Sequence, residues 1–255
     1  MSNFATYPSL EDRVVLITGG GSGIGASLVE HFASQRAKVA FLDIAEQLST
    51  NLVERLAPHC AHRPLFLPCD LTNIPTLQSA IAQISRSLGA PQVLVNNAGS
   101  DDRHDFANVT PEYWDQRMAV NLKHQFFAAQ AVAEGMKAIG SGSIINLSSI
   151  SWMIPGHRLP VYNTAKAAIV GMTRSLAHDL GPAGIRVNCV LPGAILTERQ
   201  HQLWMSPEYE QEVLSRQCLK RHLLPDDVAR LVLFLAADDS EAITNQSHII
   251  DGGWI

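Results

Sequence analysis

Residues 13–25 read RVVLITGGGSGIG, and two features of this stretch indicate the architecture of the chain. Its opening, residues 13–18, is short, rich in β-branched side chains and almost wholly apolar, as expected of a parallel strand covered on both faces. A glycine-rich loop follows at 19–25, and the apolar residues after it recur at helical spacing from Ala26 to Ala33. The sequence therefore predicts a strand, a glycine loop and a helix in direct succession.

This succession is typical of a dinucleotide site. A pyrophosphate can approach a helix N-terminus only where the turn has no Cβ atoms in its way, and the free N–H groups and the helix dipole then favour its negative charge. We expect the phosphates to lie against Gly19, Ser22, Gly23, Ile24 and Gly25.

The second predicted strand, Lys38–Leu42, ends at Asp43. A carboxylate at the tip of this strand accepts hydrogen bonds from both ribose hydroxyls of adenosine and repels a 2′-phosphate. No Arg or Lys stands at 20, 21, 44 or 45 to reverse that preference, so NAD is favoured over NADP. Asp43 would also suit the N-cap of a helix from Glu46 onward, a role that is compatible with ribose binding.

Strands and helices alternate along the rest of the chain, which predicts a parallel sheet. The fold class is therefore α/β: a single Rossmann-type, doubly wound parallel sheet of about seven strands with helices on both faces. The further strands are expected at Leu65–Leu67, Val93–Val95, Ser143–Leu147, Ile185–Val190 and Ser247–Asp251. The further helices are expected at Ile74–Leu88, from Pro111 onward, from Tyr162 to about Gly181, and at Val228–Ala237.

The composition narrows the class of protein. A chain of 255 residues can form one large domain, 1–255, with a well-buried core. The net charge of -5, without a basic block, gives no footprint for nucleic acid or for an anionic membrane, and no apolar run approaches the roughly 20 residues of a membrane span. The polar N-terminus and four cysteines without metal-type spacing favour a cytoplasmic protein with no metal.

Polar residues stand at the carboxyl ends of the predicted strands, where open α/β sheets bind ligands. Asp70 and Leu71 follow the third strand, and Asp70 suits either the adenine amino group or a turn. Consecutive carboxamides at Asn96 and Asn97 should fix a loop through hydrogen bonds. Within the long helix from Pro111, Asn121 is an amide that needs partners, and the fifth strand delivers Ser148 and Ser149.

Tyr162 and Lys166 are one helical turn apart, so the phenol and the ammonium can reach one bound molecule. A free phenol loses its proton near pH 10, and a neighbouring cation favours the phenolate. The pair therefore predicts a base that acts near neutral pH.

Together these landmarks resemble the short-chain dehydrogenase/reductase family, from one end of the chain to the other and in order. The matching stretches are TGGGSGIG at 18–25, NNAG at 96–99, Asn121, Ser149, YNTAK at 162–166, Pro192 with Gly193, and DGG at 251–253. The resemblance implies that Tyr162 is the acid/base, that Lys166 holds the nicotinamide ribose and lowers the phenol pKa, that Ser149 orients the substrate oxygen and that Asn121 supports a water. It also implies a homotetramer, and cofactor contacts from Asn97, Ala98, Gly99, Pro192, Gly193, Ile195 and Thr197.

A narrower resemblance is to the sugar-oxidising members, the L-fucose and galactose dehydrogenases acting on aldopyranoses. The stretches that carry it are 101–104 (DDRH), 110–120 (TPEYWDQRMAV), 124–130 (HQFFAAQ) and 197–204 (TERQHQLW). We expect residues 194–220 to cover the substrate, because polar groups beside an indole suit a polyol better than an acyl chain or a steroid. A solvated amphipathic helix would show the same pattern.

The expected reaction is NAD-dependent oxidation of the anomeric carbon of an L-fucose-like sugar to the lactone. Alternatives are another secondary alcohol or ketone (a cyclic alcohol, a 3-oxoacyl chain or a steroid) and a non-catalytic NAD-binding protein. The candidate substrate contacts are Asp101, Arg103, Ser149, Ser151, Trp152, Arg158, Tyr162, Glu198 and Trp204.

Overall fold

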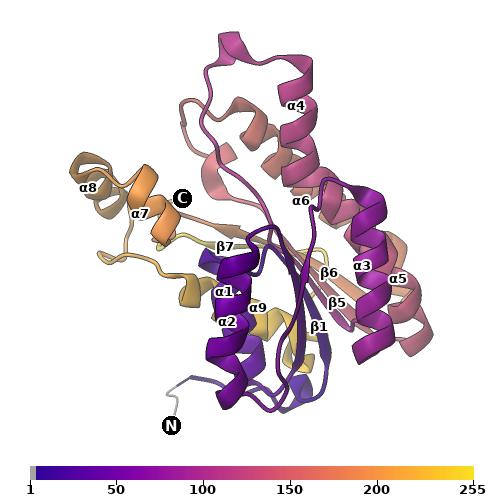
Figure 1. The fold of residues 1–255 in the computed structure, drawn as a ribbon. Helices are drawn as coiled ribbons and strands as arrows, with labels where there is room; N and C mark the ends of the chain where they lie inside the picture. The colour runs from indigo at the N-terminus through magenta and orange to yellow at the C-terminus, as the bar shows by residue number, and fades with distance from the viewer. Residues whose placement is uncertain (1–3) are drawn as a thin grey trace.

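The computed structural model describes residues 4–255, which form a seven-stranded parallel sheet with helices on both faces (Figure 1). The spatial order of the strands is β3-β2-β1-β4-β5-β6-β7. Their bounds are β1 Val14–Thr18, β2 Lys38–Asp43, β3 Leu65–Pro68, β4 Val93–Asn96, β5 Gly142–Leu147, β6 Ile185–Pro192 and β7 Ser247–Ile250. The fold class predicted from the sequence is confirmed.

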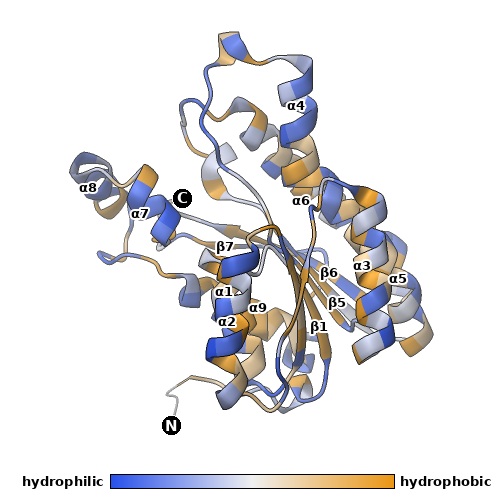
Figure 2. Ribbon diagram, in the orientation of Figure 1, coloured by the Kyte–Doolittle hydropathy of each residue, from blue (hydrophilic) through white to orange (hydrophobic). Residues whose placement is uncertain are grey.

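Two helical layers bury the faces of the sheet. Helices α1 (Gly23–Ser34), α2 (Glu46–Leu56) and α9 (Pro225–Ala236) pack on one face, where Val15 and Ile17 of β1 point. Helices α3 (Ile74–Leu88), α5 (His124–Ile139) and α6 (Pro160–Leu180) pack on the other face, against Leu16 and its neighbours. Because β1 and β4 are covered on both sides, they are apolar except at their last residues, Thr18 and Asn96, whereas β5 and β6 also carry the buried polar residues Ser143, Asn146 and Asn188 (Figure 2).

The direction of winding reverses between β1 and β4. The chain moves outward from β1 to β3, returns to β4 beside β1, and then continues to β7. At such a switch point the connections leave the two strands in opposite directions, so a crevice opens at their carboxyl ends. The glycine loop after β1 and the Asn97–Gly99 loop after β4 both lie there.

The long helix expected from Pro111 is interrupted. Helix α4 (Pro111–Met118) passes into a π-helical turn at Ala119–Lys123 before α5 begins. The predicted Val228–Ala237 helix begins three residues earlier, at Pro225, because proline suits the first turn of a helix.

Two further helices lie between β6 and α9 in the chain and extend away from the sheet. They are α7 (Glu198–Leu203) and α8 (Pro207–Arg216), which form a lobe near β7 in Figure 1, and Figure 2 colours α7 largely hydrophilic. Short 3₁₀ turns complete the described chain at Pro8–Leu10, Ala57–His59, Phe106–Asn108, Ile150–Trp152, Gly181–Ala183 and Asp238–Ser240. Within residues 4–255, no helix is long and apolar enough to cross a membrane.

Candidate active site

The glycine loop is packed so closely that side chains would not fit. A Cβ atom on Gly25 would lie 1.8 Å from the carbonyl oxygen of Gly19, and one on Gly19 would lie 2.8 Å from Cα of Ala98. Gly19 and Gly23 also have positive φ values of 67° and 53°. The loop therefore presents bare backbone at the N-terminus of α1, which is the surface that a pyrophosphate requires.

Thr197, which belongs to the C-terminal half of the chain, packs against the glycine loop. Its methyl carbon is 3.3 Å from the position of a Cβ on Gly23, and its hydroxyl oxygen accepts the N–H of Gln200 as the N-cap of α7. The segment that brings Thr197 there begins at Gly193, where a Cβ would lie 2.7 Å from that of Asp251. Ile195 anchors the segment by its burial and by a bridge to Leu223.

Asp43 stands at the end of β2 beside the glycine loop. Its two carboxylate oxygens accept the N–H groups of Gly21 and Ala45, both at 2.8 Å. The side chain thus fixes the loop and keeps further lone pairs for ribose hydroxyls. It does not cap α2 with its side chain, because the N-cap of that helix is Ala45.

The amide of Asn97 ties the loop after β4 to the loop after β1. It donates to the carbonyl oxygens of Thr18 and Gly19, at 3.0 and 2.9 Å. Behind it, buried Asn96 donates to Asn146 Oδ1 of β5 at 2.9 Å. Asn97 therefore has the loop-fixing role that the sequence predicts, whereas Asn96 joins β4 to β5 and to the carbonyl of Gln125 in α5.

Asp70 forms a turn at the end of β3. One of its carboxylate oxygens accepts both the N–H and the hydroxyl of Thr72, at 2.9 and 2.7 Å, while the next residue, Leu71, is buried. This is the turn role, and the exposed side chain keeps its second oxygen for another partner.

The π-helical turn places Asn121 inside the protein with every amide group in use. Its oxygen accepts the N–H of Ser100 at 2.8 Å, and its nitrogen donates to the carbonyls of Ser100 and Arg117 at 3.1 and 3.0 Å. A π turn is a known device for re-aiming a side chain at a functional site. Asn121 holds the loop after β4 next to Lys166, whose ammonium lies 3.2 Å from the Cβ position of Gly99.

Tyr162, Lys166 and Ser149 come together at the carboxyl edge of the sheet. The ammonium of Lys166 is buried, donates to the carbonyl of Leu147 at 2.8 Å and lies 5.6 Å from the ring centroid of Tyr162. Ser149, which follows β5, acts on the phenol by lowering its pKa, and its hydroxyl oxygen accepts the N–H of Ser151 at 3.1 Å. The arrangement places an acid/base group beside a hydroxyl that can hold a substrate oxygen.

The residues around Tyr162 raise the pKa of its phenol above the ordinary value of 10. The sequence predicted a shift in the opposite direction, caused by the charge of Lys166. Burial of the phenol is the larger cause of the raised pKa, and the negative charge of Asp101 adds to it, while the polar side chain of Ser149 opposes both. Burial likewise lowers the pKa of Lys166 to about 8. The ammonium donates to Leu147, and Lys166 is not among the groups that set the pKa of the phenol in this structure.

His124 is a fully buried histidine in the same region. Its Nε2 contacts the carbonyl of Ala98 at 3.2 Å, and burial together with the charge of Lys166 lowers its pKa to about 4. The imidazole is therefore neutral at physiological pH and supports the loop that carries Ala98.

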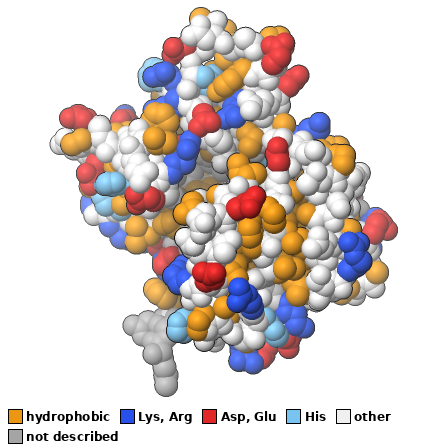
Figure 3. Space-filling view, viewed as in Figure 1, with side chains coloured by type: hydrophobic (Ala, Val, Ile, Leu, Met, Phe, Trp, Pro, Cys, Tyr) orange, Lys and Arg blue, Asp and Glu red, His pale blue; other side chains and the backbone are white. Residues whose placement is uncertain are grey.

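A polar rim joins α7 to the residues that follow the Asn97–Gly99 loop. Gln200 donates to Asp101 at 2.6 Å, Arg199 contacts Asp101 at 3.5 Å, and the same guanidinium donates to Asp102 at 2.5 Å. The guanidinium of Arg103 lies 4.7 Å from the ring centre of Trp204. Figure 3 shows the surface hollowed between the α7–α8 lobe and the lobe that carries α4, with charged side chains of both signs around the hollow.

Several buried polar atoms of the candidate substrate contacts have no partner within residues 4–255. They are Arg103 Nε, Ser151 Oγ, Trp152 Nε1 and Trp204 Nε1. A buried donor without a partner costs free energy unless a ligand satisfies it.

Two of the candidate substrate contacts, Arg158 and Glu198, are exposed and make their contacts away from these buried donors. Arg158 pairs with Asp105 at 3.1 Å, with both side chains more than half exposed, and exposed Glu198 accepts from Gln202 on the same helix.

Sequence reasoning missed two supporting residues. His104 accepts the N–H of Val161 at 3.4 Å, directly before Tyr162, and contacts the hydroxyl of Tyr113 at 3.0 Å. Arg117 donates to Asp102 at 2.6 Å. The only available signal was their place within stretches 101–104 and 110–120, because pairing between such distant positions is set by the fold.

Taken together, a glycine cradle at a topological switch point and a tyrosine–lysine pair beside it define a dinucleotide-dependent oxidoreductase. Residues 19–255 match a family model described as enoyl-(acyl carrier protein) reductase. The chain is 51% identical over 247 residues to the probable galactose dehydrogenase GalD of Rhizobium meliloti (strain 1021), covering 97% of this chain and 96% of the relative. It is also 51% identical to the D-xylose 1-dehydrogenase of Caulobacter vibrioides (strain NA1000 / CB15N), covering 98% of each.

Solved structures agree with these matches. A 7α-hydroxysteroid dehydrogenase complexed with NADH and 7-oxo glycochenodeoxycholic acid superposes with a TM-score of 0.92 at 29% identity, covering 97% of this chain and 96% of that one. This chain belongs to the short-chain dehydrogenase/reductase family and is an oxidoreductase. Dehydrogenases of this family, sugar dehydrogenases among them, use NAD(P), and the bare glycine loop fits that cofactor.

Proposed function

We propose that this protein oxidises the anomeric carbon of an aldopyranose, a sugar like L-fucose, to the lactone with NAD. The observation that carries the proposal is the polar rim: Asp101, whose charge acts on Tyr162, accepts from Gln200 of α7, and the Arg103 guanidinium lies against the indole of Trp204, with buried donors of both side chains unpartnered among residues 4–255. A polyol needs such partners for its hydroxyls. The printed names of the two sugar dehydrogenases at 51% identity support the same substrate class.

In the proposed reaction, Ser149 and Tyr162 hold the anomeric hydroxyl, and the ionised phenol takes its proton as C1 is oxidised. NAD, when bound, supplies the hydride acceptor and a positively charged ring. The glycine loop, Asp43 and Thr197 would hold the cofactor, and Lys166 would bind its nicotinamide ribose while favouring the phenolate electrostatically. Asn121 keeps the adjoining loop in place through its hydrogen bonds with Ser100.

The preference for NAD over NADP rests on Asp43. Its carboxylate faces the glycine loop through Gly21 and would lie where a 2′-phosphate must sit. Residues 194–220, which include α7 and α8, are proposed to cover the sugar.

The test is a panel of L-fucose, D-arabinose, L-galactose, D-galactose and D-xylose with NAD and with NADP, followed by the absorbance of the reduced nicotinamide. We expect at least one aldose to be oxidised with NAD, and the replacement Tyr162→Phe to lower kcat by about a thousandfold or more while NAD still binds. NAD binding is followed separately by calorimetry. Turnover that survives in Tyr162→Phe contradicts the assignment of the base, and a panel without any reaction contradicts the substrate class.

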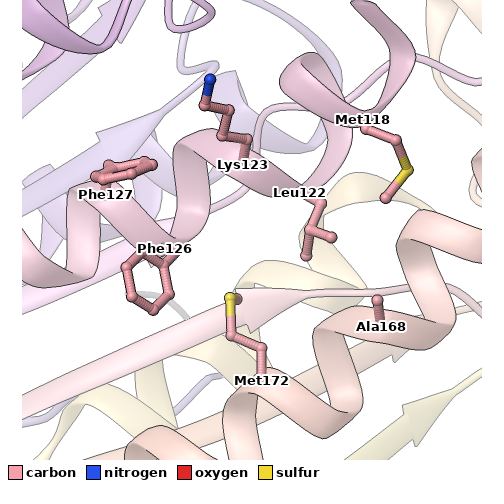
Figure 4. A pocket seen from close by; sticks show the side chains of 7 residues that line it. All are labelled: Met118, Leu122, Lys123, Phe126, Phe127, Ala168 and Met172. Atoms are coloured by element: carbon pink, nitrogen blue, oxygen red, sulfur yellow. The ribbon is translucent and has the colours of Figure 1, made fainter. Parts of the chain in front are cut away.

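We also propose that the protein is a homotetramer. An apolar hollow of about 440 Å³ lies between α4, the π turn, α5 and α6, lined by Met118, Leu122, Lys123, Phe126, Phe127, Ala168 and Met172 (Figure 4). A second partly apolar hollow lies at the outer edge of the sheet, beside β7, where Leu219 and Ile249 are exposed. Two separate faces of this kind suit a dimer of dimers.

Light scattering tests the assembly. The wild-type mass should be four times that of the chain, and Phe126→Asp should reduce it, because the charge would be buried at the α5–α6 face. A wild-type monomer contradicts the proposal.

A further inference from the structure

We propose that Arg103, which lies over the indole of Trp204, binds a carboxylate of the substrate. The preferred substrates are then aldopyranoses that carry a carboxylate remote from the anomeric carbon, as hexuronates do. The inference rests on the proposed function and deepens it, because it names a substrate class within the aldopyranoses. The oxidation at C1 is unchanged, and the carboxylate is a group that the protein binds without altering it.

Arg103 is a partly buried arginine whose N–H groups have no acceptor. Its guanidinium lies 4.7 Å from the ring centre of Trp204, and within residues 4–255 it makes no hydrogen bond or ion pair. Its Nε is buried, whereas its two Nη groups are not among the buried atoms and can be reached from solvent. The other partly buried arginines of this part of the chain all donate to carboxylates or carbonyls: Arg13, Arg117, Arg186 and Arg230.

The two aspartates that precede Arg103 do not supply the missing acceptor. Asp101 faces the guanidinium of Arg199 at 3.5 Å. Asp102 is shared between Arg199, at 2.5 Å, and Arg117, at 2.6 Å. Because this cluster contains three guanidinium groups and two carboxylates, one positive charge remains, and Arg103 carries it. One anionic group of a ligand would balance that charge.

The polar atom of Trp204 is a donor as well. Its indole Nε1 is buried and has no acceptor within residues 4–255. An indole N–H can only donate, and a guanidinium has five N–H donors and no acceptor. A sugar hydroxyl also has a proton to donate, for which this pair of side chains offers nothing. A carboxylate only accepts and matches the fork of a guanidinium, so it is the better ligand for the pair.

The loop that carries Arg103 is fixed at both ends to α6, the helix of the proposed base. At its start, a Cβ on Gly99 would lie 3.2 Å from Nζ of Lys166. At its end, His104 accepts the N–H of Val161, directly before the proposed base, at 3.4 Å. A sugar bound at the base would therefore lie beside the loop that presents Arg103.

Trp204 reaches the same loop from a different part of the chain. It is the C-cap residue of α7, whose N-cap, Thr197, packs against the glycine loop. Helix α7 thus runs from the cofactor loop to Arg103. The contact with the indole holds the guanidinium before a ligand arrives, and such preorganisation lowers the entropic cost of binding.

The experiment compares kcat/KM with NAD for pairs of sugars that differ only at C6, at about 0.15 M salt. The pairs are D-galacturonate with D-galactose and D-glucuronate with D-glucose. The variants are Arg103→Met, Arg103→Lys and Trp204→Phe. Arg216→Met is the control, because it removes an exposed arginine from α8, in the same covering segment. Thermal unfolding verifies that each variant is folded.

We expect the wild-type protein to favour at least one uronate over its neutral partner by about tenfold or more, chiefly through KM, because the carboxylate is remote from C1. Arg103→Met should lower this ratio by about ten- to a hundredfold. Arg103→Lys should keep part of the ratio, since an ammonium retains the charge and loses the fork. Trp204→Phe should lower it less than Arg103→Met, and Arg216→Met should leave it as in the wild type.

Equal kcat/KM for uronates and neutral sugars in the wild type overturns the inference and leaves the proposed function intact. The same holds if Arg103→Met lowers both members of a pair equally, as a merely structural role would. Failure of the wild-type protein to oxidise any aldose, neutral or acidic, overturns both.

Discussion

Replacement of His124 by glutamine should remove a large part of the acid sensitivity of the fold. The imidazole is fully buried, and its pKa is lowered to about 4 from 6.5. Because the native state resists protonation that the unfolded chain accepts, stability is complete above about pH 6.5 and is lost as the pH falls toward 4. Glutamine does not titrate in this range and keeps a donor for the carbonyl of Ala98.

The size of the effect follows from the two pKa values. At pH 5 the unfolded chain is about 97% protonated at this site and the native protein about 9%, which corresponds to about 2 kcal/mol of lost stability relative to pH 7.5. His248, whose pKa burial also lowers, contributes to both proteins and cancels in the difference.

The assay is urea unfolding at several pH values between about 7.5 and 5, followed by tryptophan fluorescence. The wild-type protein should lose about 2 kcal/mol more than His124→Gln over this range, and the surface replacement His59→Gln should behave as the wild type. Equal pH dependence in the wild type and His124→Gln would refute the view that a neutral imidazole is locked inside the fold.

Two other replacements test the cofactor site. Gly25→Ala should abolish NAD binding measured by calorimetry, because its Cβ would lie 1.8 Å from the oxygen of Gly19 and force the loop apart; Gly181→Ala, with no neighbour within 4 Å and helical φ, should bind NAD normally. Asp43→Ser should raise kcat/KM with NADP relative to NAD by about tenfold or more, since it removes a charge that repels the 2′-phosphate, and an unchanged ratio would contradict that role.

Most of the fold could be predicted because its determinants are local. The strands of a doubly wound sheet are buried on both faces, so they appear as short apolar runs such as residues 14–18 and 93–95. The glycine loop is predicted by its run of glycines, and the helix after it by the helical spacing of its apolar residues. The π turn at Ala119–Lys123 could not be predicted, because its apolar spacing is close to that of an ordinary helix and the contact of Asn121 with Ser100 that accompanies it is tertiary.

Some residues of the candidate site could likewise be predicted from local sequence, and others could not. Residues at the ends of strands, such as Ser149 and Asp43, could be located because the carboxyl edge of a parallel sheet collects them. The contacts of Asp101 with α7 could not, since they join positions about a hundred residues apart through flexible side chains. Nor does the spacing of Tyr162 and Lys166 reveal that burial raises the phenol pKa above its ordinary value.

The reversal of winding between β1 and β4 separates two tasks along the gene as well as in space. The segment through β3 supplies the bare glycine loop and Asp43, whereas Asp101, Ser149 and α7 of the proposed sugar site come from the segment that begins at β4. Under the proposed function, replacements in the short loops of the second segment can alter the choice of sugar without touching the glycine loop or Asp43, provided that they spare Thr197 and Lys166, which that segment supplies to the cofactor.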